Sequence, residues 1–348
     1  MAHKITSFII VEASRAKKGK EAPALAPARS APHYFEKSVP SQFILGQEKR
    51  KIDGREVGIS IKSYKPDAIL VEGSFEVENV FDNGTLLDIK DKLHEICYEL
   101  AKKYGGKEEP AEEYTVYQIS EYKGDPELFI SKNAQKIAGL LKSEKLELDE
   151  KEVEYTLSHQ FKYAKDDLVI IDWDGAFVFD PNGEFEETIE LLELANYQLL
   201  RYRILDEDLD ERMRKIEKFT QQDEIKTGWW GRWFGPPPRE VTQEFRDVIH
   251  VRSQSINQFE AMERDIKLIG EWYSARVFDL AAKKFRLSEW RDAVKEKLDS
   301  LEDSYGIASE NLGMSRVQRL ELIQIWGFFI LQIGWLVLIV LEFIYFTR

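Results

Sequence analysis

The chain has 348 residues, with 63 acidic and 49 basic side chains and a formal net charge of −14. This length can hold an α/β domain and a second unit, because about 100–200 residues per domain is usual. The negative charge argues against a nucleic-acid surface, since duplex binding depends on Lys and Arg that neutralise phosphates. The single cysteine, Cys97, excludes an internal disulfide and a cysteine-type zinc site, and its place on a helix face predicts a small core residue. The five histidines have no ligand-like spacing, so the sequence predicts neither a metal nor a cofactor.

Alternating strand and helix signals occupy residues 1–183. Alternating apolar and polar side chains predict strands, and apolar residues spaced by three and four predict helices. The predicted strands are residues 5–12, 56–64, 68–77, 114–120, 153–163, 168–173 and 176–180, and the predicted helices are residues 86–100 and 126–142. Residues 14–33 are basic and then rich in Ala and Pro, which predicts a mobile loop over about 14–38. The sequence therefore predicts an α+β fold whose first domain, residues 1–183, contains a mixed sheet.

Capping residues set the predicted ends of the two helices. Thr85 and Asp88 have the spacing of a capping box before the first helix, and Gly105 follows its last apolar residue. The dipeptide Asp125-Pro126 starts the second helix, because proline suits the first helical position.

Residues 169–180 read VIIDWDGAFVFD, which is similar to the first motif of the haloacid dehalogenase phosphatases. In that family the first Asp attacks phosphorus and the second acts as acid and base, roles that would fall to Asp172 and Asp174. The family also needs Ser or Thr, Lys and an acidic pair at the ends of later strands, and no strand-like segment follows this motif before the C-terminal apolar run. The family's Thr after the motif is Ala176 here. The pattern favours a hairpin turn at Asp174-Gly175, where glycine tolerates positive φ, and predicts no catalytic residue.

Helical periodicity dominates residues 184–320. Apolar side chains recur at helical intervals over 189–219 and again over 241–285. A break at residues 285–290, with Ser288 as N-cap, starts a third helix that runs toward the C-terminal apolar segment. These features predict a long antiparallel three-helix stalk of coiled-coil type.

A loop rich in Trp and Pro, TGWWGRWFGPPP at residues 227–238, separates the first two stalk helices. Its prolines and glycines forbid continued helix. Because indole rings settle at the water–lipid interface, one hypothesis is that the loop dips into the headgroup region. The alternative is that its aromatic side chains cap the end of the bundle or pack on a neighbouring subunit. The residues concerned are Trp229, Trp230, Arg232, Trp233 and Phe234.

The C-terminal run at residues 325–346 reads IWGFFILQIGWLVLIVLEFIYF, and only Gln332 and Glu342 are polar. About 20 apolar residues at 1.5 Å per residue cross a hydrocarbon core of about 30 Å. The sequence predicts one transmembrane helix over residues 321–346 and a tail-anchored, single-pass protein. Arg316 and Arg319 before the span favour a cytoplasmic N-terminal part, at a bacterial inner membrane or, in a eukaryote, an organellar membrane.

One face of the predicted span combines small and polar residues at helical spacing. Small residues allow close helix approach, and polar residues in a membrane usually face protein. The sequence therefore predicts a homo-oligomer whose contact face is Gln324, Gly327, Leu331, Gly334, Leu338 and Glu342.

The C-terminal part also carries a family resemblance. The long acidic helices, the segment SEWRDAVKEKLDSLEDSYGIASE at 288–310, the Arg before the span and the LEL…LIVLEFI run at 320–344 resemble the tail-anchored Required for Meiotic Nuclear Division family. This resemblance covers mostly residues 240–346. It implies a non-enzymatic membrane anchor or scaffold, and it brings no catalytic residues.

A second similarity concerns architecture only. An α/β domain followed by long helices into the membrane is similar to the CorA magnesium channels, which use two spans and a Gly-Met-Asn motif between them. Here one span is predicted, and Gly313-Met314-Ser315 precedes it. An ion-transport subunit is therefore the alternative function, and a phosphohydrolase using Asp172 and Asp174 is a second alternative.

The preferred prediction is a homo-oligomeric membrane scaffold. Its cytoplasmic α/β domain binds an unknown protein partner, and its predicted partners are the lipid bilayer and further copies of itself. No enzymatic activity and no cofactor are predicted.

Overall fold

The computed structural model describes residues 2–13, 20–21, 42–64, 67–226 and 272–347. The chain divides into two units, Met1–Asp206 with Asn257–Ala293 and Glu207–Ile256 with Val294–Arg348. We call the first the sheet unit and the second the helical unit. Helices α4 (Glu186–Lys226) and α8 (Leu287–Phe346) contribute residues to both.

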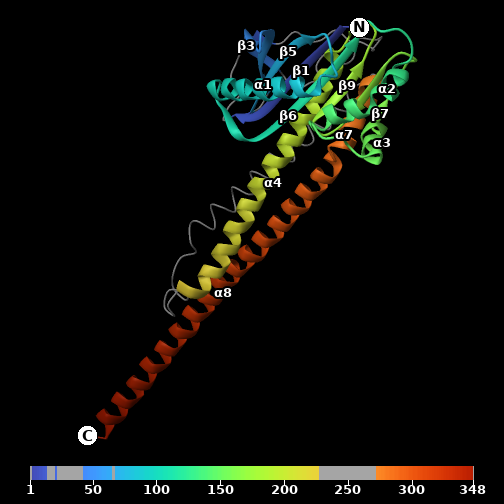
Figure 1. Cartoon of the computed structure of the whole chain (residues 1–348). Helices are drawn as coiled ribbons and strands as arrows, with labels where there is room; N and C mark the ends of the chain where they lie inside the picture. The colour runs from blue at the N-terminus through green and yellow to red at the C-terminus, as the bar shows by residue number, and fades with distance from the viewer. Residues whose placement is uncertain (1, 14–19, 22–41, 65–66, 227–271, 348) are drawn as a thin grey trace. The chain divides into compact units, whose positions relative to one another are not determined.

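A mixed sheet of nine strands forms the centre of the sheet unit (Figure 1). The strand order is β2-β3-β4-β5-β1-β6-β9-β8-β7. The β6–β9 pair is parallel, and the other pairs are antiparallel. This confirms the mixed sheet expected from the sequence. The strands are β1 (Ala2–Ala13), β2 (Lys20–Glu21), β3 (Gln42–Ile52), β4 (Arg55–Tyr64), β5 (Ala68–Val77), β6 (Gly106–Ser120), β7 (Gln160–Phe161), β8 (Leu168–Ile171) and β9 (Gly175–Phe179).

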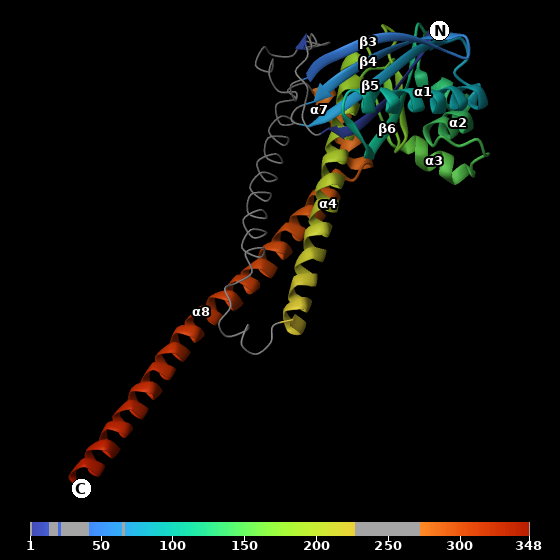
Figure 2. The ribbon, with the colours of Figure 1, turned by 90° about the vertical axis from the view of Figure 1, so that its left-hand side faces the viewer.

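Helices cover both faces of the sheet, and the central strand β1 is apolar on both sides as a result. Ile5 and Ile9 pack with the helices α1 (Asn83–Lys103) and α2 (Pro126–Leu141) on one face. Phe8 and Ile10 pack with α4 and α7 (Trp272–Lys284) on the other. Successive strand residues point to opposite faces, so an uninterrupted apolar run is what a strand between two helical layers requires. Figure 2 shows β3, β4 and β5 side by side with α1 against them.

The predicted start of α2 is confirmed, whereas the predicted start of α1 is wrong. Asp125 is the N-cap of α2, and its side chain accepts a hydrogen bond from the Glu127 amide at 3.0 Å. Helix α1 begins earlier than the predicted capping box, with Asp82 as N-cap and no side-chain capping bond. Gly105 follows α1 with φ of +97°, the left-handed conformation expected of a glycine after a helix.

The strand predicted at residues 153–163 is wrong. Residues Glu150–Ser158 form helix α3, and only Gln160–Phe161 pair as strand β7. The Asp149 side chain accepts a hydrogen bond from the Lys151 amide at 3.0 Å, which caps the helix. Val153 and Thr156 are the buried residues of α3, and their spacing of three is helical.

Strand β3 was not predicted, and β2 lies inside the predicted mobile loop. The second half of β3, QEKRKI, carries four charged residues, and its side chains are mostly exposed. Such a strand near the edge of a sheet lacks the apolar alternation that identifies inner strands. The remainder of the predicted loop lies outside the described residues.

In the helical unit, α4 and α8 are joined by an ion pair. Lys297 Nζ lies 2.7 Å from Asp210 Oδ1. Leu209 of α4 and Val294 and Leu298 of α8 are buried. The predicted break before α8 is confirmed by Arg286, whose φ is +53°.

Two further predictions about the helices have different outcomes. The predicted N-cap Ser288 is wrong, because the residue before it, Leu287, already belongs to α8. The second predicted stalk helix falls largely on residues 241–271, outside the described ranges.

Candidate functional site

A segment of 24 residues in α8, Ile323–Phe346, is strongly apolar: its most apolar 18 residues have a mean hydropathy of 2.3, and none of them is buried in this chain. At 1.5 Å per residue it extends over about 36 Å, more than the hydrocarbon thickness of about 30 Å. Leu331, Trp335 and Phe343 are 69–73% exposed. The helix is long and apolar enough to span a membrane. The predicted bounds of the span, residues 321–346, remain a prediction.

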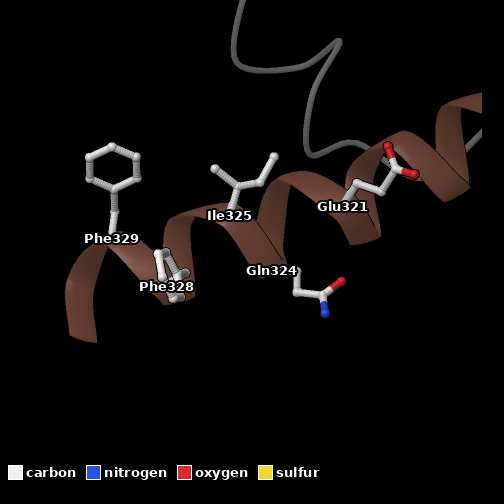
Figure 3. Close-up of a pocket in the computed structure, with 5 residues that line it drawn as sticks. All are labelled: Glu321, Gln324, Ile325, Phe328 and Phe329. Carbon is white, nitrogen blue, oxygen red and sulfur yellow. The ribbon is translucent and has the colours of Figure 1, made fainter. Parts of the chain in front are cut away.

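Polar side chains mark the beginning of the apolar segment. Glu321 and Gln324 line a surface depression together with Ile325, Phe328 and Phe329. Figure 3 shows Gln324 projecting from a different side of the helix than Ile325. Small-molecule sites bury most of their ligand's surface, which a depression lined by one helix does not do. The arrangement is instead a polar-to-apolar boundary at the start of the apolar segment.

The predicted oligomerisation face is open in this single chain. Its six residues, Gln324, Gly327, Leu331, Gly334, Leu338 and Glu342, are all exposed. A Cβ added at Gly327 or Gly334 would meet no atom within 4 Å. This face remains a prediction. Gln332 does not belong to it, since at about 100° per residue it lies about 160° around the helix from Gly334.

The motif residues Asp172 and Asp174 lie in the turn between β8 and β9. Ile171 pairs with Ala176 across that turn, which confirms the predicted hairpin. The role predicted for Gly175 is wrong, because Gly175 is the first residue of β9 and is not among the positive-φ glycines. A Cβ at this position would lie 2.6 Å from the carbonyl oxygen of Thr115 on β6. Glycine is needed here for close backbone approach.

The Asp172 carboxylate is held by lysines from the helical layers on both faces of the sheet. Its side chain is 1% exposed, and Lys284 Nζ of α7 lies 2.6 Å from Oδ1. Nζ of Lys142, the C-cap residue of α2, lies 3.6 Å from Asp172 Oδ2 and 2.7 Å from Glu152 Oε1. The Tyr114 hydroxyl donates to the Asp172 carbonyl at 3.1 Å. These contacts fasten α2 and α7 to the end of β8.

This geometry does not fit a phosphatase nucleophile. Such a carboxylate must have an oxygen available to the substrate, whereas the carboxylate of Asp172 is buried against Lys284. Burial raises the pKa of Asp174, opposed by Lys90 and reinforced by Asp172. Within the ranges given above, β9 is the last strand, so no later strand end brings the family's other residues to this turn.

A buried hydrogen-bonded chain, which the sequence analysis missed, links β1, α1 and β6. Ser7 Oγ lies 2.6 Å from His94 Nε2 and 2.7 Å from Thr115 Oγ1. His94 Nδ1 lies 3.0 Å from Glu113 Oε2. The hydrogen bond from His94 lowers the pKa of Glu113 to about 2, although partial burial acts in the opposite direction.

The order of hydroxyl, imidazole and carboxylate in this chain is that of a serine hydrolase triad. Ser7, however, is 0% exposed, beneath α1 in the middle of the central strand. A substrate carbonyl therefore has no path to the Ser7 hydroxyl in this conformation. The chain of hydrogen bonds satisfies buried polar groups and fixes α1 on the sheet. The only signal in the sequence is the polar pair Ser7 and His94 on otherwise apolar faces.

A third polar cluster lies on the opposite face, where α4 packs on β4 and β5. Lys62 Nζ lies 2.9 Å from Glu193 Oε1 and 2.8 Å from Glu72 Oε2. The Tyr64 hydroxyl donates to Glu193 at 2.6 Å. Burial raises the pKa of Glu193 to about 7, although Lys62 opposes the shift. Burial acts on Glu72 in the same direction, but the attraction of Lys62 outweighs it and lowers the pKa of Glu72.

The remaining predicted positions have different outcomes. Cys97 is buried in the α1 layer as predicted, and burial raises the pKa of its thiol to about 12. In the part of the chain that the structure describes, no group of His, Cys, Asp or Glu is arranged to hold a metal ion. The predicted interface loop, with Trp229, Trp230, Arg232, Trp233 and Phe234, lies outside the described residues.

Comparison with known proteins places the sheet unit in a family. Residues 4–186 match the family model described as "Uncharacterized protein MJ0711, N-terminal domain". Uncharacterized protein MJ0711 of Methanocaldococcus jannaschii is 29% identical over 257 residues, which are 73% of this chain and 74% of that protein. The alignment is longer than the matched range, so the similarity continues past residue 186 into the helical part. No solved structure matches the chain. Because the family model covers more than half of the chain, this protein belongs to the MJ0711 N-terminal domain family.

Proposed function

We propose that this protein is a single-span membrane scaffold, in which α8 anchors the chain and the sheet unit binds a protein partner. The observation that carries the proposal is the wholly exposed apolar segment Ile323–Phe346. An apolar surface of this length is unfavourable in water, and a bilayer is the environment that covers all sides of a lone helix. The copies associate through their spans as a homo-oligomer. The helices between the sheet unit and the span form an antiparallel stalk.

The orientation rests on the charges that precede the segment. Arg316 and Arg319 lie within a few residues of the span, where cations mark the cytoplasmic side of a membrane protein. The sheet unit is therefore proposed to lie in the cytoplasm. The resemblance of residues 240–346 to the Required for Meiotic Nuclear Division family supports an anchor or scaffold in the same way.

A binding role fits the polar clusters better than an enzymatic one. The Asp172 carboxylate is buried with its Oδ1 paired to Lys284, and the Ser7 hydroxyl is enclosed under α1. At the same edge of the sheet unit, Tyr155 is 56% and Trp173 is 44% exposed. Lys284 connects them, with Nζ 5.0 Å from the Tyr155 ring centroid and paired with Asp172, the neighbour of Trp173. Exposed aromatic side chains are the type enriched in protein interfaces.

The proposal is tested with the full chain and a chain that ends before Leu320. The full chain should remain in the membrane pellet after alkaline carbonate extraction, whereas the shortened chain should be in the supernatant. Light scattering in nanodiscs should give a defined oligomer for the full chain, and the shortened chain should be monomeric in buffer. A full chain that carbonate extracts from the membrane contradicts the anchor, and a monomeric full chain contradicts the homo-oligomer.

A further inference from the structure

Gln332 lies near the middle of the apolar segment of α8. It is nine residues after Ile323 and fourteen before Phe346, which places it about 13 Å and about 21 Å from the two ends of the segment. Its side chain is exposed on the helix surface. A carboxamide has two N–H donors and one carbonyl acceptor, and hydrocarbon offers partners for none of them.

The side chains of Gln324 and Glu342, by contrast, lie close to the ends of the span. Gln324 is one residue from the start of the segment, and Glu342 is four residues, about 6 Å, from its end. Both can extend toward the water–lipid interface, as long polar side chains near helix ends do. A glutamine side chain at the position of Gln332 is too short to reach either interface. Gln332 is therefore the side chain with both donors and an acceptor to satisfy inside the membrane, whereas the indole of Trp335, also near the middle of the segment, has one N–H donor and no acceptor.

A second copy of the same helix supplies that partner. Two parallel copies anchored by identical segments lie at the same depth, so Gln332 of one copy meets Gln332 of the other. The carboxamide is self-complementary, since each side chain donates one N–H to the carbonyl of its counterpart. An interhelical hydrogen bond between such side chains is a recognised stabilising contact in membranes.

We propose that two copies of this chain associate through the face of α8 centred on Gln332, with the two carboxamides hydrogen-bonded to each other at mid-membrane. This inference rests on the proposed membrane anchor, and it puts the contact on a different face of α8 from the one predicted from the sequence, which contains Gly327 and Gly334. The flanking positions at intervals of three and four are bulky, namely Phe328, Phe329, Trp335, Leu336 and Ile339. These side chains hold the helices at the spacing of ordinary helix packing, about 8–10 Å, rather than at the closer spacing that glycines permit.

The two possible faces of the span can be distinguished by a matched pair of cysteine variants. Leu336 lies one turn after Gln332, whereas Leu338 belongs to the face with Gly327 and Gly334. The two leucines are two residues apart, so they differ little in depth but by about 160° around the helix. Cys97 is buried and its thiol pKa is raised to about 12, so the unsubstituted chain serves as a control that should not cross-link.

The experiment is oxidative cross-linking of full-length Leu336→Cys and Leu338→Cys in membranes, scored as disulfide-linked dimer on gels. We expect a dimer with Leu336→Cys and little or none with Leu338→Cys. Dimer with Leu338→Cys alone would overturn the inference in favour of the glycine face, and dimer with neither would overturn any close contact between spans.

Substitution of Gln332 then tests the hydrogen bond itself. In the Leu336→Cys background, Gln332→Leu should weaken association about five-fold, corresponding to the loss of about 1 kcal/mol. Gln332→Asn should retain part of the association, and Gln324→Leu should leave the association unchanged. Carbonate extraction of every variant separates the two proposals, because Gln332→Leu makes the span more apolar and should leave anchoring intact. Equal cross-linking in Gln332→Leu and the parent would reject the role of Gln332 while the anchor remains.

Discussion

The sheet unit buries polar side chains, whereas the apolar segment of α8 exposes apolar ones. In the sheet unit, ionisable side chains such as Asp172 and Glu193 are buried, and each has a lysine partner within 3 Å. In the segment Ile323–Phe346 the apolar side chains are exposed, and no part of the described chain covers them. A buried charge is tolerable because its partners replace water, and an exposed apolar helix is tolerable where lipid replaces water. The buried charges of the first region therefore have their partners within one chain, and the second region has the exposed apolar surface on which the proposed membrane anchor rests.

The largest expected effect comes from removing one partner of a buried charge. Lys284→Ala leaves the Asp172 carboxylate without its contact at 2.6 Å, and the Lys142 ammonium at 3.6 Å from the other oxygen does not replace it. Breaking a buried ion pair in this way costs about 4 kcal/mol. The free energy of unfolding of the full chain in nanodiscs, followed by urea titration, should fall by this amount.

The control for Lys284→Ala is Lys283→Ala, which changes the exposed neighbour in the same helix and should alter stability by about 0.5 kcal/mol or less. Adding Asp172→Asn to Lys284→Ala should restore part of the loss, because the unpaired charge is then gone. Equal stability of the Lys284→Ala and Lys283→Ala variants would contradict the structural role of the pair.

The converse change introduces a charge into the apolar segment. Val337 lies in the central part of the span, and a lysine at the centre of a transmembrane helix costs about 3 kcal/mol on insertion scales. Val337→Lys should therefore shift the insertion equilibrium of the segment by about this amount, measured in a translocon insertion assay. Val337→Leu should insert as the parent does. An unchanged insertion equilibrium with lysine would indicate that lipid does not surround this helix.

The same contrast explains which elements could be predicted from the sequence. The inner strand β1 and helix α2 carry local signals, namely an apolar run and the Asp125-Pro126 start, and both were predicted. Helix α3 was predicted as a strand because Val153, Tyr155 and Leu157 alternate with polar residues, and the capping bond of Asp149 decides the outcome. The apolar segment of α8 was recognisable because span length and composition are local properties.

The polar clusters were not predictable because their members are far apart in the chain. Ser7 and His94 are separated by 87 positions, and Lys62 and Glu193 by 131. The sequence showed that Gly175 belongs to the turn, but it did not show why a glycine is required there. The requirement comes from the carbonyl oxygen of Thr115, which lies on another strand. Sequence patterns report which residues are polar, whereas the partner of each polar residue depends on the order of strands in the sheet.

The last prediction is a change in pH dependence, and it tests whether the buried carboxyl of Glu193 holds a proton in the folded state. Its ordinary pKa of 4.5 is raised to about 7 by burial, so between these values the folded chain binds more protons than the unfolded chain. Stability should therefore fall as pH rises through this window, with a contribution of at most about 1.4 kcal/mol per pH unit. Glu193→Gln removes this titration while its amide oxygen can still accept from Tyr64, so the variant should show a flatter pH profile of unfolding free energy. Glu186→Gln, an exposed position on the same helix, should keep the parent slope. Parallel profiles for Glu193→Gln and the parent would mean that Glu193 stays ionised, stabilised by Lys62 and the Tyr64 hydroxyl.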